Sequence, residues 1–300
     1  MKITCNPQLN FKNDAHFYES ADYVIAGLEP YPSDFFKQFP NVKVLSRVGV
    51  GVDNVDVTSA SNHNVKVFVT SDEPSVAVAE LCISNMISLL RHTFEMSDNL
   101  KNGIWKPVQG RELRSCTVGI IGLGSIGKQV VKRVSVFGSR IIGYGRTWEK
   151  EFASNYHVER KNIQEVFKEA NVITIHLPLT SETKGLISHD LIQSVQKGTV
   201  ILNTSRASVM DNEALLEAVK SERVQGSAVD VFEEDKDPYP YGNAERVILT
   251  PHIGSHTIET RRSMEKMAAK NLLVYSSLND TSDNEKIREI LTYIDKHTVN

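Results

Sequence analysis

The chain has 300 residues, of which 40% are hydrophobic and 24% are charged, and its formal net charge at pH 7 is -3. This is the composition of a soluble globular protein, and the length suffices for two domains. The small net charge and the lack of a dense Lys/Arg cluster argue against a general nucleic-acid or membrane surface. They favour small molecules as partners.

The cysteines indicate whether a metal site is expected, and the N-terminus indicates the expected cellular location. Cys5, Cys82 and Cys116 are odd in number, and none lies near a histidine in metal-ligand spacing. We therefore expect reduced thiols and no metal site. The N-terminal residues contain no apolar signal-peptide core, and no stretch of the chain reaches the length of a membrane helix. The expected location is the cytoplasm.

In the first part of the chain, short β-branched runs alternate with helix-compatible segments. This alternation predicts a parallel sheet with helices on its faces, within a small first domain at residues 1–73. The predicted strands are Lys2–Thr4, Tyr23–Ala26, Val42–Val48 and Val65–Thr70, and the predicted helices are Asp14–Glu19, Ser33–Gln38 and Val57–Asn62.

The loop from Arg47 to Asn54, RVGVGVDN, follows one of these strands. Its two glycines can leave backbone N–H groups open to an anion, although an ordinary turn is the alternative. The helical stretch that comes next contains the mostly apolar run Ala77–Leu90, which predicts a long connecting helix buried between domains. We expect Cys82 to pack in this helix, and His92 at its polar end to be solvated.

The stretch Thr117–Gly127, TVGIIGLGSIG, combines a β-branched strand, a glycine turn and the start of an amphipathic helix. Gly122 allows the tight turn, Gly124 lets the backbone approach a pyrophosphate, and Gly127 packs the helix against the strand. The N-terminus of the helix then faces the phosphates. An ordinary glycine-rich turn is the alternative, but the strand before it and the helix after it favour a bound dinucleotide.

Strands and helices continue to alternate up to residue 254, so residues 74–254 are predicted to form a doubly wound domain of six strands. Asn162 followed by Glu165 is the signature of a helix capping box. Residues 255–300 are expected to add two helices that return to the first domain. The predicted strands after the glycine loop are Ser139–Tyr144, Val172–His176, Thr199–Asn203, Val224–Val231 and Arg246–Thr250; the helices are Asn162–Ala170, Ser188–Val195, Asp211–Lys220, one ending at Leu273, and Asn284–Lys296.

Polar residues follow three of these strands, and they suggest a reaction. Arg206, Asp230 and His252 are delivered to one edge of the sheet. Hydride transfer to a ketone needs a proton donor and a cation, which His252 and Arg206 can supply. A carboxylate on the other imidazole nitrogen would orient the ring and favour its protonated form. Each residue has a structural alternative, but their arrival together beside a dinucleotide loop favours catalysis.

At these residues the sequence resembles the D-isomer-specific 2-hydroxyacid dehydrogenases, and among them the short phosphoglycerate dehydrogenase-like and glyoxylate/hydroxypyruvate reductase-like members. The resemblance implies an α/β protein with two doubly wound parallel-sheet domains, a Rossmann cofactor domain inserted in a smaller flavodoxin-like substrate domain, usually in a homodimer. The matching stretches are Ser46–Asp56, Ser75–Leu81, the GLGSIG loop, His176–Ile187, Leu202–Asp211, Gly226–Phe232 and Leu249–Thr257.

The resemblance also implies roles for single residues. Arg206 matches the catalytic arginine, His252 the acid/base and Asp235 the acid that orients it, while Asp230 matches a contact to the nicotinamide side. The residues expected to bind substrate are Arg47, Val50, Gly51, Arg206 and His252. Those expected to bind the cofactor are Gly122, Gly124, Ser125, Ile126, Gly127, Gly145, Arg146, Thr147, Pro178, Thr183, Thr204, Ser205, Asp230, His252 and Gly254.

Departures from the family pattern leave some roles open. The acidic run carries extra residues before Pro238, so Glu234 is an alternative to Asp235 as the orienting acid. Ala26–Pro30 occupies the segment where genuine phosphoglycerate dehydrogenases often carry an arginine, although Arg47 can still face a phosphate. The substrate therefore stays open.

The cofactor preference depends on the residues after the strand Ser139–Tyr144. Gly145, Arg146 and Thr147 stand where NAD-dependent members carry an acid, which favours NADP(H) while NAD(H) remains possible. Glu149 is the one nearby charge of the wrong sign.

The first hypothesis for function is reversible reduction of a 2-keto acid, such as glyoxylate or hydroxypyruvate, to a D-2-hydroxy acid. A D-3-phosphoglycerate dehydrogenase is one alternative. An NAD(P)-sensing binding protein similar to transcriptional co-repressors is another, because such proteins retain the same residues.

Overall fold

The computed structural model describes residues 14–233, 237–242, 244–279, 285, 287–289 and 292. The chain divides into a smaller unit, residues 1–74 with 257–300, and a larger unit, residues 75–256. None of the described helices has both the length and the apolar composition needed to cross a membrane. The strand predicted at Lys2–Thr4 and most of the helix predicted at Asn284–Lys296 lie outside the described residues.

The smaller unit contains a parallel sheet of three described strands in the order β1-β2-β3. One face packs against an aromatic cluster that includes Phe35, Phe36 and Phe39. On β2, Val44 packs with Leu272, and the Ser46 hydroxyl donates to a helical carbonyl at 2.9 Å. The elements are β1 (Tyr23–Ala26), β2 (Val44–Arg47), β3 (Lys66–Phe68), α1 (Ala15–Tyr18), α2 (Ser33–Gln38), α3 (Val57–Asn62) and α11 (Ile258–Asn279).

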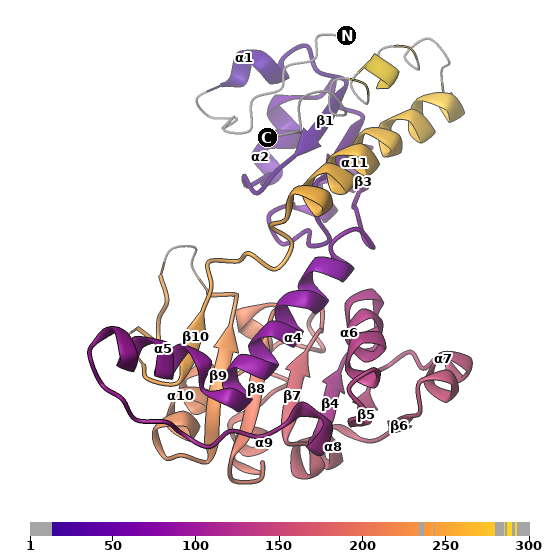
Figure 1. The fold of residues 1–300 in the computed structure, drawn as a ribbon. Coiled ribbons are helices and arrows are strands. Elements are labelled where there is room, and N and C mark those ends of the chain that lie inside the picture. Colours follow the sequence, from indigo (N-terminus) through magenta and orange to yellow (C-terminus); the bar gives the residue numbers. More distant parts are fainter. Residues whose placement is uncertain are drawn as a thin grey trace. The chain divides into compact units, whose positions relative to one another are not determined.

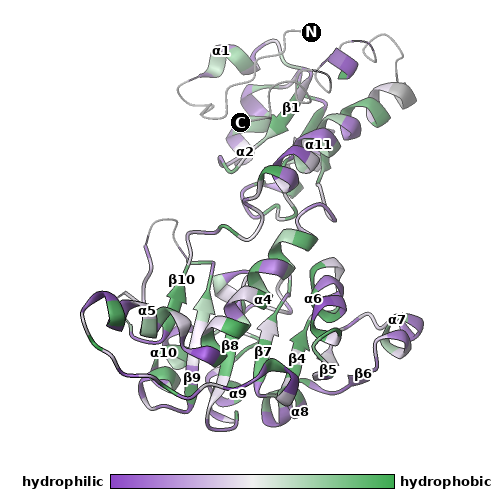
Figure 2. Ribbon diagram, viewed as in Figure 1, coloured by the Kyte–Doolittle hydropathy of each residue, from purple (hydrophilic) through white to green (hydrophobic). Residues whose placement is uncertain are grey.

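The larger unit contains a seven-stranded parallel sheet in the order β10-β9-β8-β7-β4-β5-β6. Its central strands are buried on both faces, as a parallel sheet between helical layers requires, and hydrophobic residues concentrate in them (Figure 2). The strands are β4 (Thr117–Ile121), β5 (Arg140–Tyr144), β6 (Val158–Arg160), β7 (Val172–Ile175), β8 (Thr199–Asn203), β9 (Val224–Val229) and β10 (Val247–Leu249).

Helices cover both faces of this sheet. Val78 and Met86 of α4 pack with Val130 of α6 over one face, where Figure 1 shows these two helices side by side. Phe167 and Leu215 pack over the other face. The helices are α4 (Ser75–Arg91), α5 (Thr93–Lys101), α6 (Ser125–Ser135), α7 (Lys150–Asn155), α8 (Ile163–Glu169), α9 (His189–Gln193) and α10 (Asn212–Lys220).

The structure corrects the sequence-based prediction at two places in the larger unit. The sheet has a seventh strand, β6, preceded by α7, and neither was predicted. The β6 strand has only three residues, Val158 alone is buried, and an edge position does not demand an apolar run. His92 is not a solvated side chain: it is 16% exposed, with its Nδ1 3.3 Å from Glu95, and its backbone is left-handed between α4 and α5.

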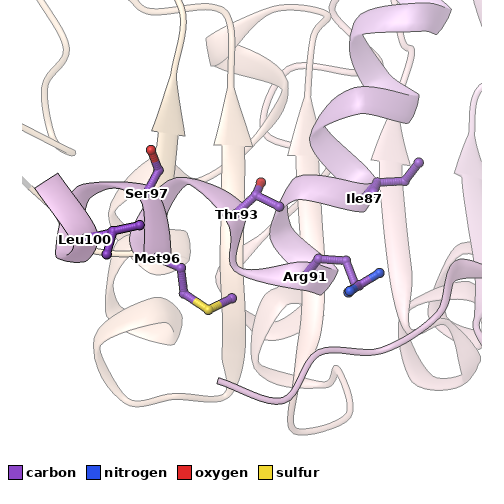
Figure 3. A pocket seen from close by; sticks show the side chains of 6 residues that line it. All are labelled: Ile87, Arg91, Thr93, Met96, Ser97 and Leu100. Atoms are coloured by element: carbon purple, nitrogen blue, oxygen red, sulfur yellow. The ribbon is translucent and has the colours of Figure 1, made fainter. Parts of the chain in front are cut away.

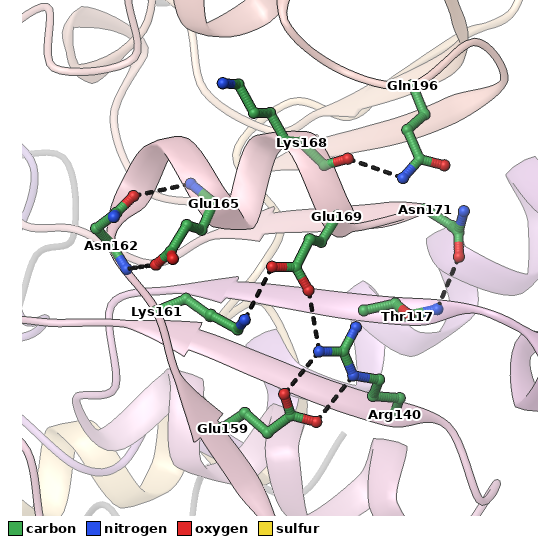
Figure 4. Close-up of polar contacts among 10 residues, drawn as sticks. All are labelled: Thr117, Arg140, Glu159, Lys161, Asn162, Glu165, Lys168, Glu169, Asn171 and Gln196. Atoms are coloured by element: carbon green, nitrogen blue, oxygen red, sulfur yellow. Dashed lines mark hydrogen bonds and ion pairs between the residues drawn. The ribbon is translucent and has the colours of Figure 1, made fainter.

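Charged and polar side chains connect β5, β6 and α8 (Figure 4). Arg140 pairs with Glu159 at 2.6 Å and with Glu169 at 2.9 Å, and Lys161 also reaches Glu169 at 2.9 Å. Hydrogen bonds from Lys161 and Arg140 lower the pKa of the Glu169 carboxyl. The predicted capping box of α8 is confirmed, because the side chains of Asn162 and its partner three residues later each accept from the other's backbone N–H.

Candidate active site

The glycine loop follows β4 and leads directly into α6. Gly122 has a φ of 100°, and a Cβ there would collide with the backbone carbonyl of His176. A Cβ on Gly127 would collide with the carbonyl oxygen of Gly122, whereas a Cβ on Gly124 would meet nothing within 4 Å. Gly124 is also the N-cap of α6, and no side chain caps that helix. Tight packing at two glycines and open space at the third fit a cradle for a pyrophosphate beside Ser125 and Ile126.

The segment after β5 carries the residues expected to read the cofactor's ribose. A Cβ on Gly145 would lie 3.3 Å from the carbonyl oxygen of Thr147. The Arg146 guanidinium pairs with the Glu182 carboxylate at 3.0 Å, and both side chains are exposed. Glu149 pairs instead with Lys128. The expectation that Glu149 is the one nearby charge of the wrong sign is therefore wrong, because Glu182 lies against Arg146.

The loop after β7 contains Pro178 and Thr183, two expected cofactor residues. The Thr183 hydroxyl donates to the Pro178 carbonyl at 2.6 Å and accepts from the backbone N–H of Thr180 at 2.8 Å. The backbone N–H of Thr183 donates to the Thr180 hydroxyl at 3.3 Å. The Thr183 side chain thus braces its own loop.

The segment after β8 carries Thr204, Ser205 and Arg206. Asn203, which is fully buried, organises it: its Oδ1 accepts from the Ser205 backbone N–H at 3.0 Å, and its Nδ2 donates to the Arg206 carbonyl at 3.0 Å. The Arg206 guanidinium donates to the Ser205 carbonyl at 2.6 Å. The sequence-based interpretation did not assign Asn203 a role in the site, although a polar residue directly after the apolar run Val200–Leu202 was a visible signal.

His252 lies in a turn after β10 that is fixed by Asp230 at the end of β9. Asp230 is 2% exposed and accepts three hydrogen bonds: from the Thr250 hydroxyl at 2.5 Å, and from the backbone N–H groups of Ile253 and Gly254, both at 2.9 Å. The His252 backbone has a φ of 53°, and its side chain is exposed. Asp230 therefore holds the residues on both sides of His252, a contact that strand spacing alone does not predict.

Two buried groups near these strand ends do not titrate at neutral pH. Burial lowers the pKa of the His176 imidazole to about 3, and its Nε2 lies 3.0 Å from the Thr174 hydroxyl. Burial raises the pKa of the Cys82 thiol to about 11, and its sulfur lies 3.5 Å from the Thr204 hydroxyl. Cys82 packs in α4, as the sequence predicted, and His176 is likewise buried.

The acidic run after β9 is only partly described. Glu233 accepts from the Ser208 hydroxyl at 2.7 Å and 3.0 Å. Glu234 and Asp235, the two candidates for orienting His252, lie outside the described residues.

In the smaller unit, the loop after β2 carries the expected substrate residues. Gly49 is held by Thr70, whose hydroxyl accepts from its N–H at 2.8 Å. The Arg47 side chain is 8% exposed and donates to the carbonyl of Val48. Val50 is exposed and Gly51 is half-buried. The loop is therefore accessible to a ligand at Val50 and Gly51, while the Arg47 guanidinium donates to its own loop.

Over one face of the larger sheet, α4 and α5 form a pocket (Figure 3). Figure 3 shows side chains from both helices around it. Its lining residues are Ile87, Arg91, Thr93, Met96, Ser97 and Leu100.

A parallel sheet covered on both faces, with a GxGxxG loop running into an uncapped helix, defines a dinucleotide-binding protein of the Rossmann type. Residues 83–254 match the model of the D-isomer specific 2-hydroxyacid dehydrogenase NAD binding domain. The chain is 35% identical over 245 residues to a hydroxypyruvate reductase of Thermotoga maritima, covering 80% of this chain and 79% of that protein. It therefore belongs to the D-isomer-specific 2-hydroxyacid dehydrogenase family of nicotinamide-dependent oxidoreductases.

Two further relatives differ in length and name. The chain is 39% identical over 244 residues to a D-3-phosphoglycerate dehydrogenase of Methanocaldococcus jannaschii, covering 80% of this chain but 46% of that protein. It thus spans about half the length of that relative. A crystal structure of a glyoxylate reductase from Paecilomyes thermophila superposes with a TM-score of 0.80 at 27% identity, covering 88% of this chain and 83% of that one.

Proposed function

We propose that this protein catalyses the reversible reduction of a 2-keto acid to a D-2-hydroxy acid, with NADPH favoured over NADH. The observation that carries the proposal is the turn around His252, which Asp230 fixes at the same edge of the sheet as the glycine loop. The hydroxypyruvate and glyoxylate reductases among the relatives support this class of substrate.

In this reaction a bound NADPH supplies the hydride. The exposed His252 imidazole donates a proton to the carbonyl oxygen as negative charge develops on it. The Arg206 guanidinium binds the substrate carboxylate and stabilises the same oxygen. In the smaller unit, the family resemblance implies that backbone N–H groups at Val50 and Gly51 are donors to a substrate carboxylate. Thr204 and Ser205 line the cofactor side of this edge.

Asp230 acts in this scheme as a positioning residue as well as a contact for the nicotinamide side. A buried carboxylate that accepts three hydrogen bonds holds a left-handed turn in a single conformation. It thereby limits the directions in which His252 can present its ring.

A panel of keto acids tested with both cofactors examines the proposal directly. We expect turnover of glyoxylate or hydroxypyruvate, with kcat/KM for NADPH at least about tenfold above that for NADH, because a charge-assisted contact contributes about 1.5 to 3 kcal/mol. Arg146→Ala and Gly145→Asp should each reduce this ratio, and added salt should reduce it in the wild type. Equal efficiency with both cofactors, or a preference that survives both substitutions, would show that this segment does not read the phosphate.

A D-3-phosphoglycerate dehydrogenase is the second candidate, because a relative of that name is 39% identical. The smaller unit argues against it. Glu29, in the segment after β1, accepts from the Gly27 N–H at 3.2 Å and from the Tyr31 hydroxyl. A carboxylate in this segment disfavours a substrate phosphate. Substantial oxidation of 3-phosphoglycerate in the same panel would favour this second candidate.

Replacing Arg206 with lysine tests the proposed substrate contact. Lysine keeps the positive charge but loses the planar pair of donors, so we expect kcat to fall and KM for the keto acid to rise. Initial rates at saturating cofactor measure both constants. A KM that is unchanged for every keto acid tested would mean that Arg206 does not touch the substrate.

We also propose a homodimer, as the family resemblance implies. Apolar side chains are exposed on and beside α5, and a second copy of the chain is the partner that would cover them. They are Phe94, Leu100, Ile104 and Trp105. Light scattering should give about twice the 33.5 kDa chain mass, and a monomer mass would contradict the proposal.

A further inference from the structure

We propose that Glu182 is a specificity-determining residue for the cofactor: it engages the Arg146 guanidinium and thereby limits the preference for NADPH. This inference rests on the proposed function, in which Arg146 reads the ribose 2'-phosphate. It adds a second residue, from a different loop, whose negative charge opposes binding of the 2'-phosphate by Arg146.

The position of the ion pair carries the inference. Arg146 follows β5 and Glu182 follows β7, and in the sheet β4 lies between these two strands. The 3.0 Å pair therefore joins the loops on either side of the strand that leads into the glycine loop. In a parallel sheet of this type, the cofactor binds at the carboxyl-terminal ends of the strands. Arg146 and Glu182 thus meet where the adenosine half of the cofactor is expected to bind.

The loop that carries Glu182 is held in place. Thr180 and Thr183, which flank it, exchange hydrogen bonds at 2.8 Å and 3.3 Å, and Thr183 also donates to the Pro178 carbonyl. The backbone at Glu182 is therefore braced although its side chain is 71% exposed. The Arg146 side chain is 83% exposed, so a ligand in solvent can reach the guanidinium and replace the carboxylate.

Glu182 and a 2'-phosphate compete for the same donors. A guanidinium binds a carboxylate or a phosphate through the same fork of N–H groups. NADPH must displace the carboxylate from Arg146 and then place its phosphate close to that negative charge. NADH carries a neutral hydroxyl at this position and meets neither cost. Glu149 cannot have the same effect, because Lys128 is its partner.

Binding of cofactor fragments tests the inference without turnover. By calorimetry, Glu182→Gln should bind adenosine 2',5'-bisphosphate about threefold to tenfold more tightly than the wild type, while its affinity for ADP stays within about twofold. The gain is modest because the pair is exposed. Glu245→Gln, the same charge change at an exposed residue before β10 on the opposite edge of the sheet, should change neither affinity. In an Arg146→Ala background, Glu182→Gln should lose most of its effect.

The outcomes separate this inference from the proposed function. If Arg146→Ala weakens only the bisphosphate but Glu182→Gln changes neither ligand, Arg146 reads the phosphate and the role of Glu182 is wrong. If Arg146→Ala leaves both affinities unchanged, the proposed NADPH preference fails as well. If Glu182→Gln weakens both ligands equally, Glu182 supports the adenosine site rather than opposing the phosphate, and the inference is again wrong.

Discussion

Replacing His252 with glutamine is expected to reduce kcat for keto-acid reduction by about 100- to 10,000-fold, the range for removing a general acid. Glutamine can still form a hydrogen bond but cannot donate a proton to a developing alkoxide. The dissociation constant of NADPH should stay within a few fold, because the glycine loop and α6 are untouched. Steady-state kinetics and fluorescence titration of the cofactor measure the two quantities separately.

His256→Gln is the matched control. His256 is also exposed, lies four residues further along, and is not assigned a role in catalysis. We expect its turnover to stay within a few fold of the wild type. A His252→Gln protein that keeps turnover within tenfold of the wild type would remove His252 from the mechanism.

Gly127→Ala is expected to destabilise the larger unit strongly. Alanine normally stabilises a helix by about 0.5–1 kcal/mol relative to glycine. Here the added Cβ would overlap the carbonyl oxygen of Gly122, and overpacking against backbone costs about 3 kcal/mol. The steric cost exceeds the helical gain, so Tm should fall by roughly 4 to 10 °C. Thermal unfolding monitored by circular dichroism measures the shift.

Gly124→Ala separates the two uses of glycine in this loop. Its Cβ would meet no protein atom within 4 Å, so stability should change by about 1 kcal/mol or less. The methyl group would instead stand where the backbone must approach a pyrophosphate, and NADPH should bind at least about tenfold more weakly. Unchanged cofactor affinity in this folded variant would show that Gly124 does not face the phosphates.

Much of the fold could be predicted because local patterns and tertiary structure agree. The apolar run of β4 is buried on both faces, and the capping box at Asn162 needs only residues three positions apart. By contrast, α7 and β6 have few buried residues and depend on their neighbours in the sheet. His92 was mispredicted because the polar end of a helix pattern does not reveal the turn into α5, where the His92 side chain is only 16% exposed.

In the candidate active site, too, local features could be predicted from the sequence and contacts between distant segments could not. The Gly122 to Gly127 spacing could be interpreted from the sequence because Gly127 packs against the carbonyl oxygen of Gly122 within the same loop. Contacts between loops that follow different strands cannot be predicted from the spacing of residues along the sequence. The three hydrogen bonds at Asp230 join β9 to the turn after β10, and the pair of Arg146 with Glu182 joins loops that are 36 residues apart. The sequence identified Arg146 but suggested the nearer Glu149 as its opposing charge.

The most direct test of the central claim is the stereochemistry of the product. The protein should be incubated with NADPH and the keto acid it reduces best, and the hydroxy acid should be analysed by chiral chromatography. The account predicts one D-2-hydroxy acid formed for each NADPH oxidised. An L-configured or racemic product, or no cofactor oxidation with any keto acid, would contradict it.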